Sequence, residues 1–133
     1  MKILKRSLIG IILVPFVLIA LFILYEIVGM AVNHISSSQQ TKKLINTIDT
    51  EFSSVKIIDT YTETGNTTGT SNHVDMLSVV TFTTETPLSE IQDKLGEYYE
   101  RDEFWIENME ESENGYLVYL RQAAPFWDNI EGH

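Results

Sequence analysis

The residues best suited to chemistry in this chain are carboxylates that crowd one segment. Calcium takes roughly six to eight oxygen ligands, many of them from carboxylates, so the segment is a candidate cation site. Its spacing does not match the EF-hand loop, which requires the pattern D-x-[DN]-x-[DN]-G. We therefore predict a solvated acidic face, with cation or small-ligand binding as the alternative. The carboxylates are Glu97, Glu100, Asp102, Glu103, Glu107, Glu110, Glu111 and Glu113.

A histidine and an aspartate form the second candidate. His73 and Asp75 alternate within a segment of strand character, so both point to the same face of that strand. A protein zinc site uses about three or four ligands, and the other histidines, His34 and His133, are distant in the sequence. We expect a hydrogen-bonded histidine at a loop edge and assign no metal-ligating residue.

The motifs of common enzyme classes are missing from the sequence. It contains no G-x-S-x-G, no cysteine, no phosphate-binding Walker loop and no dinucleotide fingerprint. Carboxylate pairs are so frequent that their presence does not single out a catalytic acid and base. The sequence therefore predicts a non-enzymatic protein with no catalytic or cofactor-binding residues and no cofactor, and a carboxylate-dependent hydrolase is the weaker alternative.

Aromatic residues gather in the last third of the chain. Most are expected in the core, because aromatic side chains dominate the cores of small domains. Exposed aromatics beside acids would instead suit a protein interface, and this alternative stays open. The residues are Tyr98, Tyr99, Phe104, Trp105, Tyr116, Tyr119, Phe126 and Trp127.

A long apolar segment precedes all of these candidates. Residues 8–25 carry no charged side chain, and 27–32 can extend the run. At about 1.5 Å per residue, a helix over 8–32 can cross a hydrocarbon core of about 30 Å. The sequence therefore predicts a single-pass transmembrane helix, with the lipid bilayer as its partner through residues 8–32.

The apolar segment resembles both a signal anchor and a cleaved signal peptide. Residues 29–31 would pass as a weak cleavage site, but the apolar run is longer than a usual signal-peptide core. We therefore expect an uncleaved anchor in the cell membrane. Lys2, Lys5 and Arg6 precede the run, so the positive-inside rule keeps the N-terminus cytoplasmic and places the rest outside. Glu26 is expected at the outer interface, with pairing to a basic residue of a partner helix as the alternative.

The part of the chain beyond the anchor is strongly acidic. From residue 33 onward, 6 Lys and Arg face 18 Asp and Glu, a formal balance of −12. Such a surface repels nucleic acid and anionic lipid. We therefore expect a small extracytoplasmic interaction domain that serves as an accessory or binding subunit for a protein partner.

Hydrophobic periodicity indicates how this domain is built. An amphipathic helix is expected with Thr41 on its solvated side, and the serine-glutamine stretch before it is either a flexible joint or a polar turn of a continuing helix. Thr86 is expected to cap a second helix. Asn114 and Gly115 are typical of a hairpin turn. The predicted elements are helices at 38–52 and 86–101 and strands at 55–62, 73–84, 104–111 and 116–122.

The predicted class is α+β: a single transmembrane helix, then helix, two strands, helix and two strands, with an antiparallel sheet. We expect a basic cytoplasmic N-terminus (1–7), an anchor (8–32), a stalk helix (33–53) and an extracytoplasmic domain (54–133) that packs with 41–53. The side chains expected in the core are Leu44, Ile48, Phe52, Val80, Phe82, Ile91, Leu95, Val118 and Leu120.

Overall fold

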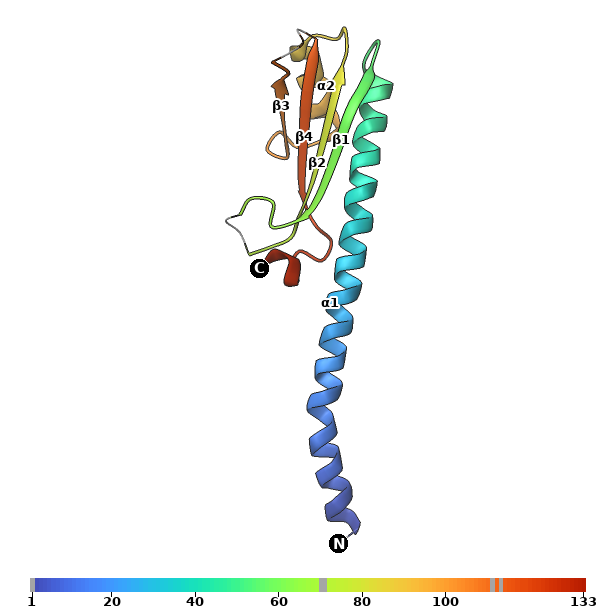
Figure 1. Cartoon of the computed structure of the whole chain (residues 1–133), viewed down its shortest axis with the longest axis vertical. Coiled ribbons are helices and arrows are strands. Elements are labelled where there is room, and N and C mark those ends of the chain that lie inside the picture. The colour runs from blue at the N-terminus through green and yellow to red at the C-terminus, as the bar shows by residue number, and fades with distance from the viewer. Residues whose placement is uncertain (1, 70–71, 111, 113) are drawn as a thin grey trace.

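The computed structural model describes residues 2–69, 72–110, 112 and 114–133. Two helices and four strands follow one another, and a single 3-10 turn closes the chain (Figure 1). The class is α+β, as predicted. The elements are α1 (Lys2–Glu51), β1 (Lys56–Gly65), β2 (Asp75–Thr83), α2 (Leu88–Tyr98), β3 (Phe104–Asn108), β4 (Gly115–Ala123) and η1 (Ile130–Gly132).

Helix α1 is continuous over 50 residues, so the expected helices at 8–32 and 38–52 are one helix, which corrects the predicted order of elements. The serine-glutamine stretch is therefore a polar turn of one helix. Its hydroxyl groups bond back into the helix, since Ser37 Oγ donates to the Asn33 carbonyl at 3.0 Å and Thr41 Oγ1 to the Ser37 carbonyl at 3.2 Å. Pro15 also lies inside the helix, where membrane segments tolerate proline.

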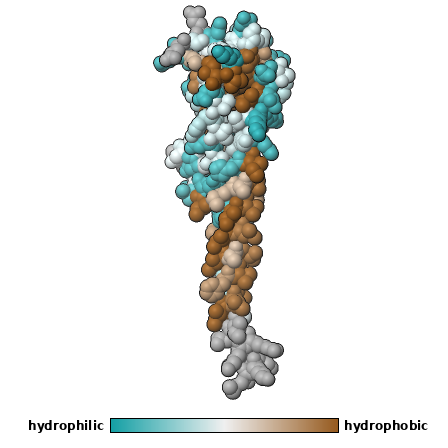
Figure 2. Space-filling model, turned by 45° about the vertical axis from the view of Figure 1, so that its right-hand side comes forward, coloured by the Kyte–Doolittle hydropathy of each residue, from teal (hydrophilic) through white to brown (hydrophobic). Residues whose placement is uncertain are grey.

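The N-terminal half of α1 projects away from the rest of the protein. Among the described residues, α1 is the one helix that is long and apolar enough to cross a membrane by length and composition, and its most apolar window is not covered by the domain. Figure 2 shows hydrophobic residues along this projecting part and mainly hydrophilic residues on the visible face of the domain.

The four strands form one antiparallel sheet in the order β1-β2-β4-β3. Both helices cover the same face of this sheet. Val80 and Phe82, which were expected in the core, share the inward face of β2 with Met76 and Ser78, and all four side chains are buried. Two helices on one face leave the other face of the sheet without a covering layer.

The core lies between the helices and the inner face of the sheet. All nine side chains predicted for it are buried, so that prediction is confirmed. Tyr99 and Tyr116 join the same cluster. The rings of Phe52 and Phe82 stack with centroids 6.2 Å apart and planes 4° apart, which joins the end of α1 to the middle of the sheet.

Closer to the apolar half of α1, the contact between α1 and the sheet is polar. Thr41 is only 6% exposed, which corrects the prediction that it faces solvent. Its Oγ1 lies 2.7 Å from the hydroxyls of both Thr62 and Ser78. Gln40 Nε2 donates to Ser78 Oγ at 3.0 Å and to the Leu120 carbonyl at 3.1 Å. These bonds satisfy polar groups that would otherwise be costly to bury.

Helix α2 begins differently from the prediction. Pro87 occupies the cap position, and no side chain caps the helix. Thr86 instead accepts a hydrogen bond at 3.2 Å from the backbone N–H of Ser53, just after α1. The Thr86 hydroxyl therefore links the loop after α1 to the loop before α2. It does not cap the first turn of α2.

The C-terminal tail, residues 124–133, folds back onto α1. Figure 1 shows η1 beside the middle of α1, at the end of the domain nearest the projecting half of that helix. Asn33 Nδ2 donates to the Phe126 carbonyl and Asn33 Oδ1 accepts from the Phe126 N–H, both at 2.9 Å. The contact between α1 and the domain thus reaches well beyond residues 41–53, as far as Tyr25, whose ring centroid lies 5.5 Å from that of Phe126.

Candidate functional site

The outer face of the sheet carries an ordered row of large side chains. The strand registers place Tyr61 opposite Val79, Val79 opposite Tyr119, and Tyr119 opposite Trp105. The row therefore crosses all four strands. Leu77 and Leu117 lie in the neighbouring rows of the same face. Because no described helix covers this face, the row is available to a binding partner.

Two aromatic rings at the β3 end of the row are fixed in place. Trp105 and Tyr119 stack with centroids 4.7 Å apart and planes 5° apart. The Arg121 guanidinium lies 5.0 Å from the centre of the Trp105 ring, within the range of a cation–π contact. A rigid aromatic surface of this kind loses little conformational entropy when a partner binds.

Carboxylates border the row and bond to its phenols. Tyr119 Oη donates to Glu107 Oε2 at 3.1 Å, and Tyr61 Oη donates to Glu63 Oε2 at 3.0 Å. Partial burial and then the Glu107 carboxylate raise the pKa of Tyr119, while the hydrogen bond to Glu63 is the main cause of the raised pKa of Tyr61. The outer face therefore combines flat aromatic surface with negative charge.

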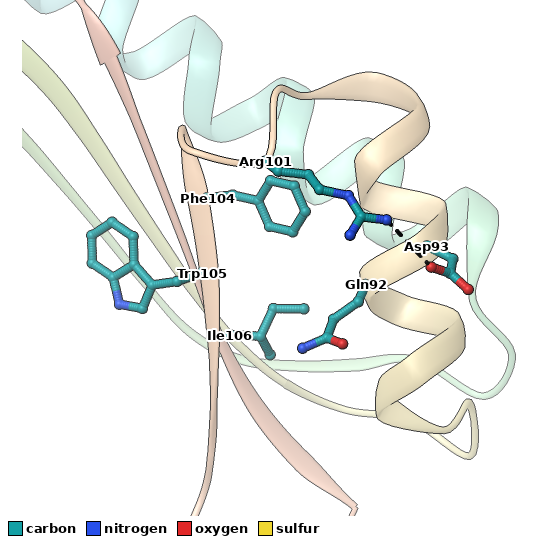
Figure 3. Close-up of a pocket in the computed structure, with 6 residues that line it drawn as sticks. All are labelled: Gln92, Asp93, Arg101, Phe104, Trp105 and Ile106. Carbon is teal, nitrogen blue, oxygen red and sulfur yellow. Dashed lines mark ion pairs between the residues drawn. The ribbon is translucent and has the colours of Figure 1, made fainter.

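A groove between α2 and β3 adjoins the row. Its volume is about 340 Å³. Figure 3 shows Phe104 and Ile106 pointing from β3 toward α2, whereas Trp105 points to the opposite side of the strand. Arg101 Nη2 lies 3.8 Å from Asp93 Oδ1 at the rim of the groove. Its apolar floor and polar rim are typical of sites that accept a side chain.

Strand β3 is the edge of the sheet and pairs only with β4 among the described strands. The Arg121 N–H donates to the Glu103 carbonyl at 2.7 Å and the Met109 N–H to the Gly115 carbonyl at 2.8 Å. In an antiparallel pair, alternate residues face the partner strand, so Phe104, Ile106 and Asn108 direct their N–H and C=O groups outward. This edge is a template for one further strand.

The described carboxylates of the acidic segment do not converge on one point. Glu103 Oε2 accepts from Gln122 Nε2 at 3.0 Å, Glu107 accepts from Tyr119, and Glu97 Oε2 lies 3.6 Å from Lys94 Nζ. Within the described part of the chain, no three His, Asp or Glu side chains are grouped so that they could hold a metal ion. Glu111 and Glu113 lie outside the described residues.

His73 and Asp75 do share one strand end, as their spacing predicts. His73 Nε2 lies 3.3 Å from Asp75 Oδ1, and Asp75 is buried. His34 is not part of this pair, because its Nε2 lies 2.6 Å from Glu131 Oε1 in the tail. Glu26 Oε2 accepts a hydrogen bond from the Ile130 N–H at 2.9 Å, so this carboxylate binds the tail of its own chain.

The aromatics of the last third divide between the core and the surface. Tyr99 and Tyr116 are buried, whereas Tyr98 and Trp127 are exposed. The row on the outer face was not predicted as a unit, because Tyr61 and Val79 belong to strands far from Trp105 in the sequence. The alternation of strand 73–84 is the available signal, because Val79 directly precedes the expected core residue Val80 and so falls on the opposite face.

Comparison with protein-family models, with curated proteins and with solved structures finds no match to this chain.

Proposed function

We propose that this chain is a single-pass membrane protein whose acidic extracytoplasmic domain binds a protein partner and has no enzymatic activity. The observation that carries the proposal is the aromatic row, Tyr61–Val79–Tyr119–Trp105, which faces solvent and ends at the free edge of β3. Interfaces are enriched in aromatic side chains, and their strongest contacts often involve Trp and Tyr.

The chemistry of the partner follows from the charges around the row. Glu107, Glu63 and Asp59 lie on the same face as the aromatics, within a domain of strongly negative charge. An extended segment of the partner that alternates basic and apolar residues would match the two faces of the sheet at β3. As an added strand, it would place basic groups beside Glu107 and apolar groups in the α2–β3 groove.

The proposed topology keeps the N-terminus in the cytoplasm and the domain outside the cell membrane, because Lys2, Lys5 and Arg6 precede the apolar run. The polar tail contacts support an outer boundary near Tyr25. Glu26 and Asn33 bond to backbone groups of the tail, and such irregular backbone does not lie exposed in hydrocarbon. Residues 8–25 then form the embedded segment.

Site-specific crosslinking in intact membranes tests the proposed partner surface. A photoreactive residue at Thr81, beside the aromatic row, should yield a discrete crosslinked partner, and one at exposed Asp49 on α1 should not. Loss of a central interface aromatic often costs about 2 kcal/mol or more, so Trp105→Ala should reduce the product about thirtyfold. Trp127→Ala is the matched control, because this tryptophan lies in the tail.

A second pair of variants tests the free edge. Asn108→Pro removes an outward N–H and should weaken the crosslink, whereas Asn108→Ala keeps that N–H and should preserve it. The same product from Thr81 and Asp49 would contradict the proposed surface. A product that is insensitive to Trp105→Ala would contradict the role of the aromatic row.

A further inference from the structure

The tail is attached to α1 where the apolar run ends. Ile130 N–H bonds to Glu26, which directly follows Tyr25, and His34 bonds to Glu131. Phe126 packs at this level, since its ring centroid lies 5.5 Å from that of Tyr25. A Cβ atom on Gly29 would lie 3.0 Å from the Phe126 ring, so a larger residue here would push the ring away by a few tenths of an ångström.

Two large apolar side chains of the tail remain uncovered. Trp127 is 58% exposed and Ile130 is 62% exposed, although the tail is held by several hydrogen bonds. A cleft of about 320 Å³ separates the tail from α1 at the same level. Its lining combines Phe22 and Tyr25 with the carboxylates of Glu26 and Asp128.

We infer that the tail rests on the outer lipid–water interface, with Trp127 and Ile130 inserted among the headgroups. The inference rests on the proposed membrane anchor, because it takes the level of the interface from the end of residues 8–25. Tryptophan favours this zone, where its ring meets apolar chains and its N–H meets water. The lipid–water interface is therefore the environment that suits the exposed Trp127 and Ile130 side chains.

The charges of the tail specify the kind of lipid surface. Glu26 and Asp128 line the cleft, and Glu131 lies beside it. Their neighbours are histidines, since His133 Nε2 lies 3.7 Å from Asp128 Oδ1 and His34 contacts Glu131, so with neutral histidines the charge here is negative. Carboxylates repel anionic headgroups, so the tail suits zwitterionic lipids whose ammonium groups can approach the acids. Contacts at α1 and at the tail would then hold the domain in one orientation on the bilayer.

The two tryptophans of the chain provide the test. The full chain is placed in phosphatidylcholine vesicles as Trp105→Phe, which leaves Trp127, and as Trp127→Phe, which leaves Trp105. Lipids brominated near the headgroup end of the acyl chain should quench Trp127 at least about twofold, because interfacial groups lie in this zone. Trp105, on the sheet, should keep its emission, and bromine near the chain ends should quench Trp127 less.

Flotation of the same vesicles separates the possible failures. If the chain floats with the lipid but Trp127 is quenched no more than Trp105, the tail does not rest on the interface and the anchor stands. If alkaline washing strips the chain from the vesicles, so that it no longer floats with the lipid, the anchor and the tail contact are both wrong. Equal quenching by anionic and zwitterionic vesicles would overturn the charge preference.

Discussion

Replacing Asn33 with alanine should release the tail from α1. The Asn33 side chain is fully buried, and its amide makes two 2.9 Å bonds to the backbone of Phe126. Each bond contributes about 0.5–1.5 kcal/mol net, and a buried group left without a partner costs about 1–3 kcal/mol. Docking of the tail should therefore weaken by about 2–4 kcal/mol.

Amide hydrogen exchange of the full chain in detergent micelles measures this loss locally. The Phe126 N–H should exchange roughly thirtyfold faster or more in Asn33→Ala, since about 1.4 kcal/mol corresponds to a factor of ten. The Val118 N–H, in the middle of β4, should keep most of its protection. Asn46→Ala is the matched control, because Asn46 is exposed on the same helix. Unchanged protection of Phe126 in Asn33→Ala would refute the proposed role of this amide.

Replacing Asn33 with aspartate should make the docking of the tail depend on pH, and the direction of the effect can be predicted. Asn33→Asp places a carboxylate oxygen against the Phe126 carbonyl, so the charged form is disfavoured and burial should raise the pKa of this carboxyl. When protonated, the carboxyl can donate to that carbonyl and accept from the Phe126 N–H. Protection of Phe126 should therefore recover as the pH falls, and Asn33→Ala should show no such recovery.

Three further outcomes are expected. Phe82→Ala should destabilise the domain by about 3–5 kcal/mol in thermal unfolding of the full chain, because a fully buried ring is lost, and an unchanged melting temperature would contradict its place in the core. Tyr119 should ionise above the ordinary tyrosine pKa of 10.0 in an ultraviolet titration, and Glu107→Gln should lower its pKa. Because the raised pKa belongs to the folded state, the associated stabilisation is present below pH 10.0 and is lost as the pH rises through the folded pKa. A reporter enzyme fused after His133 should be active only outside the cytoplasm, and activity confined to the cytoplasm would reverse the proposed orientation.

Much of the core could be predicted because its side chains repeat with the period of their element. Leu44, Ile48 and Phe52 recur at helical spacing, and Val80 and Phe82 alternate with outward residues of a strand. These patterns are local, so they can be identified before the partner elements are known. The sequence also reveals the acidic residues that lie beside the aromatic row. It does not predict which of them lie next to which aromatic side chain.

The polar half of the α1–sheet contact could not be predicted from such patterns. Asn33, Ser37, Gln40 and Thr41 are hydrophilic, and hydropathy assigns such residues to solvent. They are buried because groups distant in the sequence satisfy them, such as Thr64 Oγ1, which lies 2.6 Å from Ser37 Oγ. Docking of the tail has the same origin, since it depends on the side chain of Asn33 meeting the backbone of Phe126.

The aromatic row depends on strand order as well. Tyr61 and Trp105 lie on opposite edge strands and belong to one row only because β4 inserts between β2 and β3. The alternation of each strand predicts which side chains face outward. It does not predict which strands are neighbours, because that choice is made by the packing of α1 and α2 on the other face.

A depth profile along α1 tests the central claim most directly: its apolar half crosses a bilayer, and the same rigid helix carries the domain at the outer surface. Spin labels would replace Leu18, Ile27, Ile35 and Asn46, all exposed positions of α1, in vesicles. Their relative accessibility to oxygen and to a water-soluble nickel complex reports depth. We predict that Leu18 lies in hydrocarbon, Ile27 near the interface, and Ile35 and Asn46 in water. A water-accessible Leu18, or an Ile35 buried in hydrocarbon, would contradict the account.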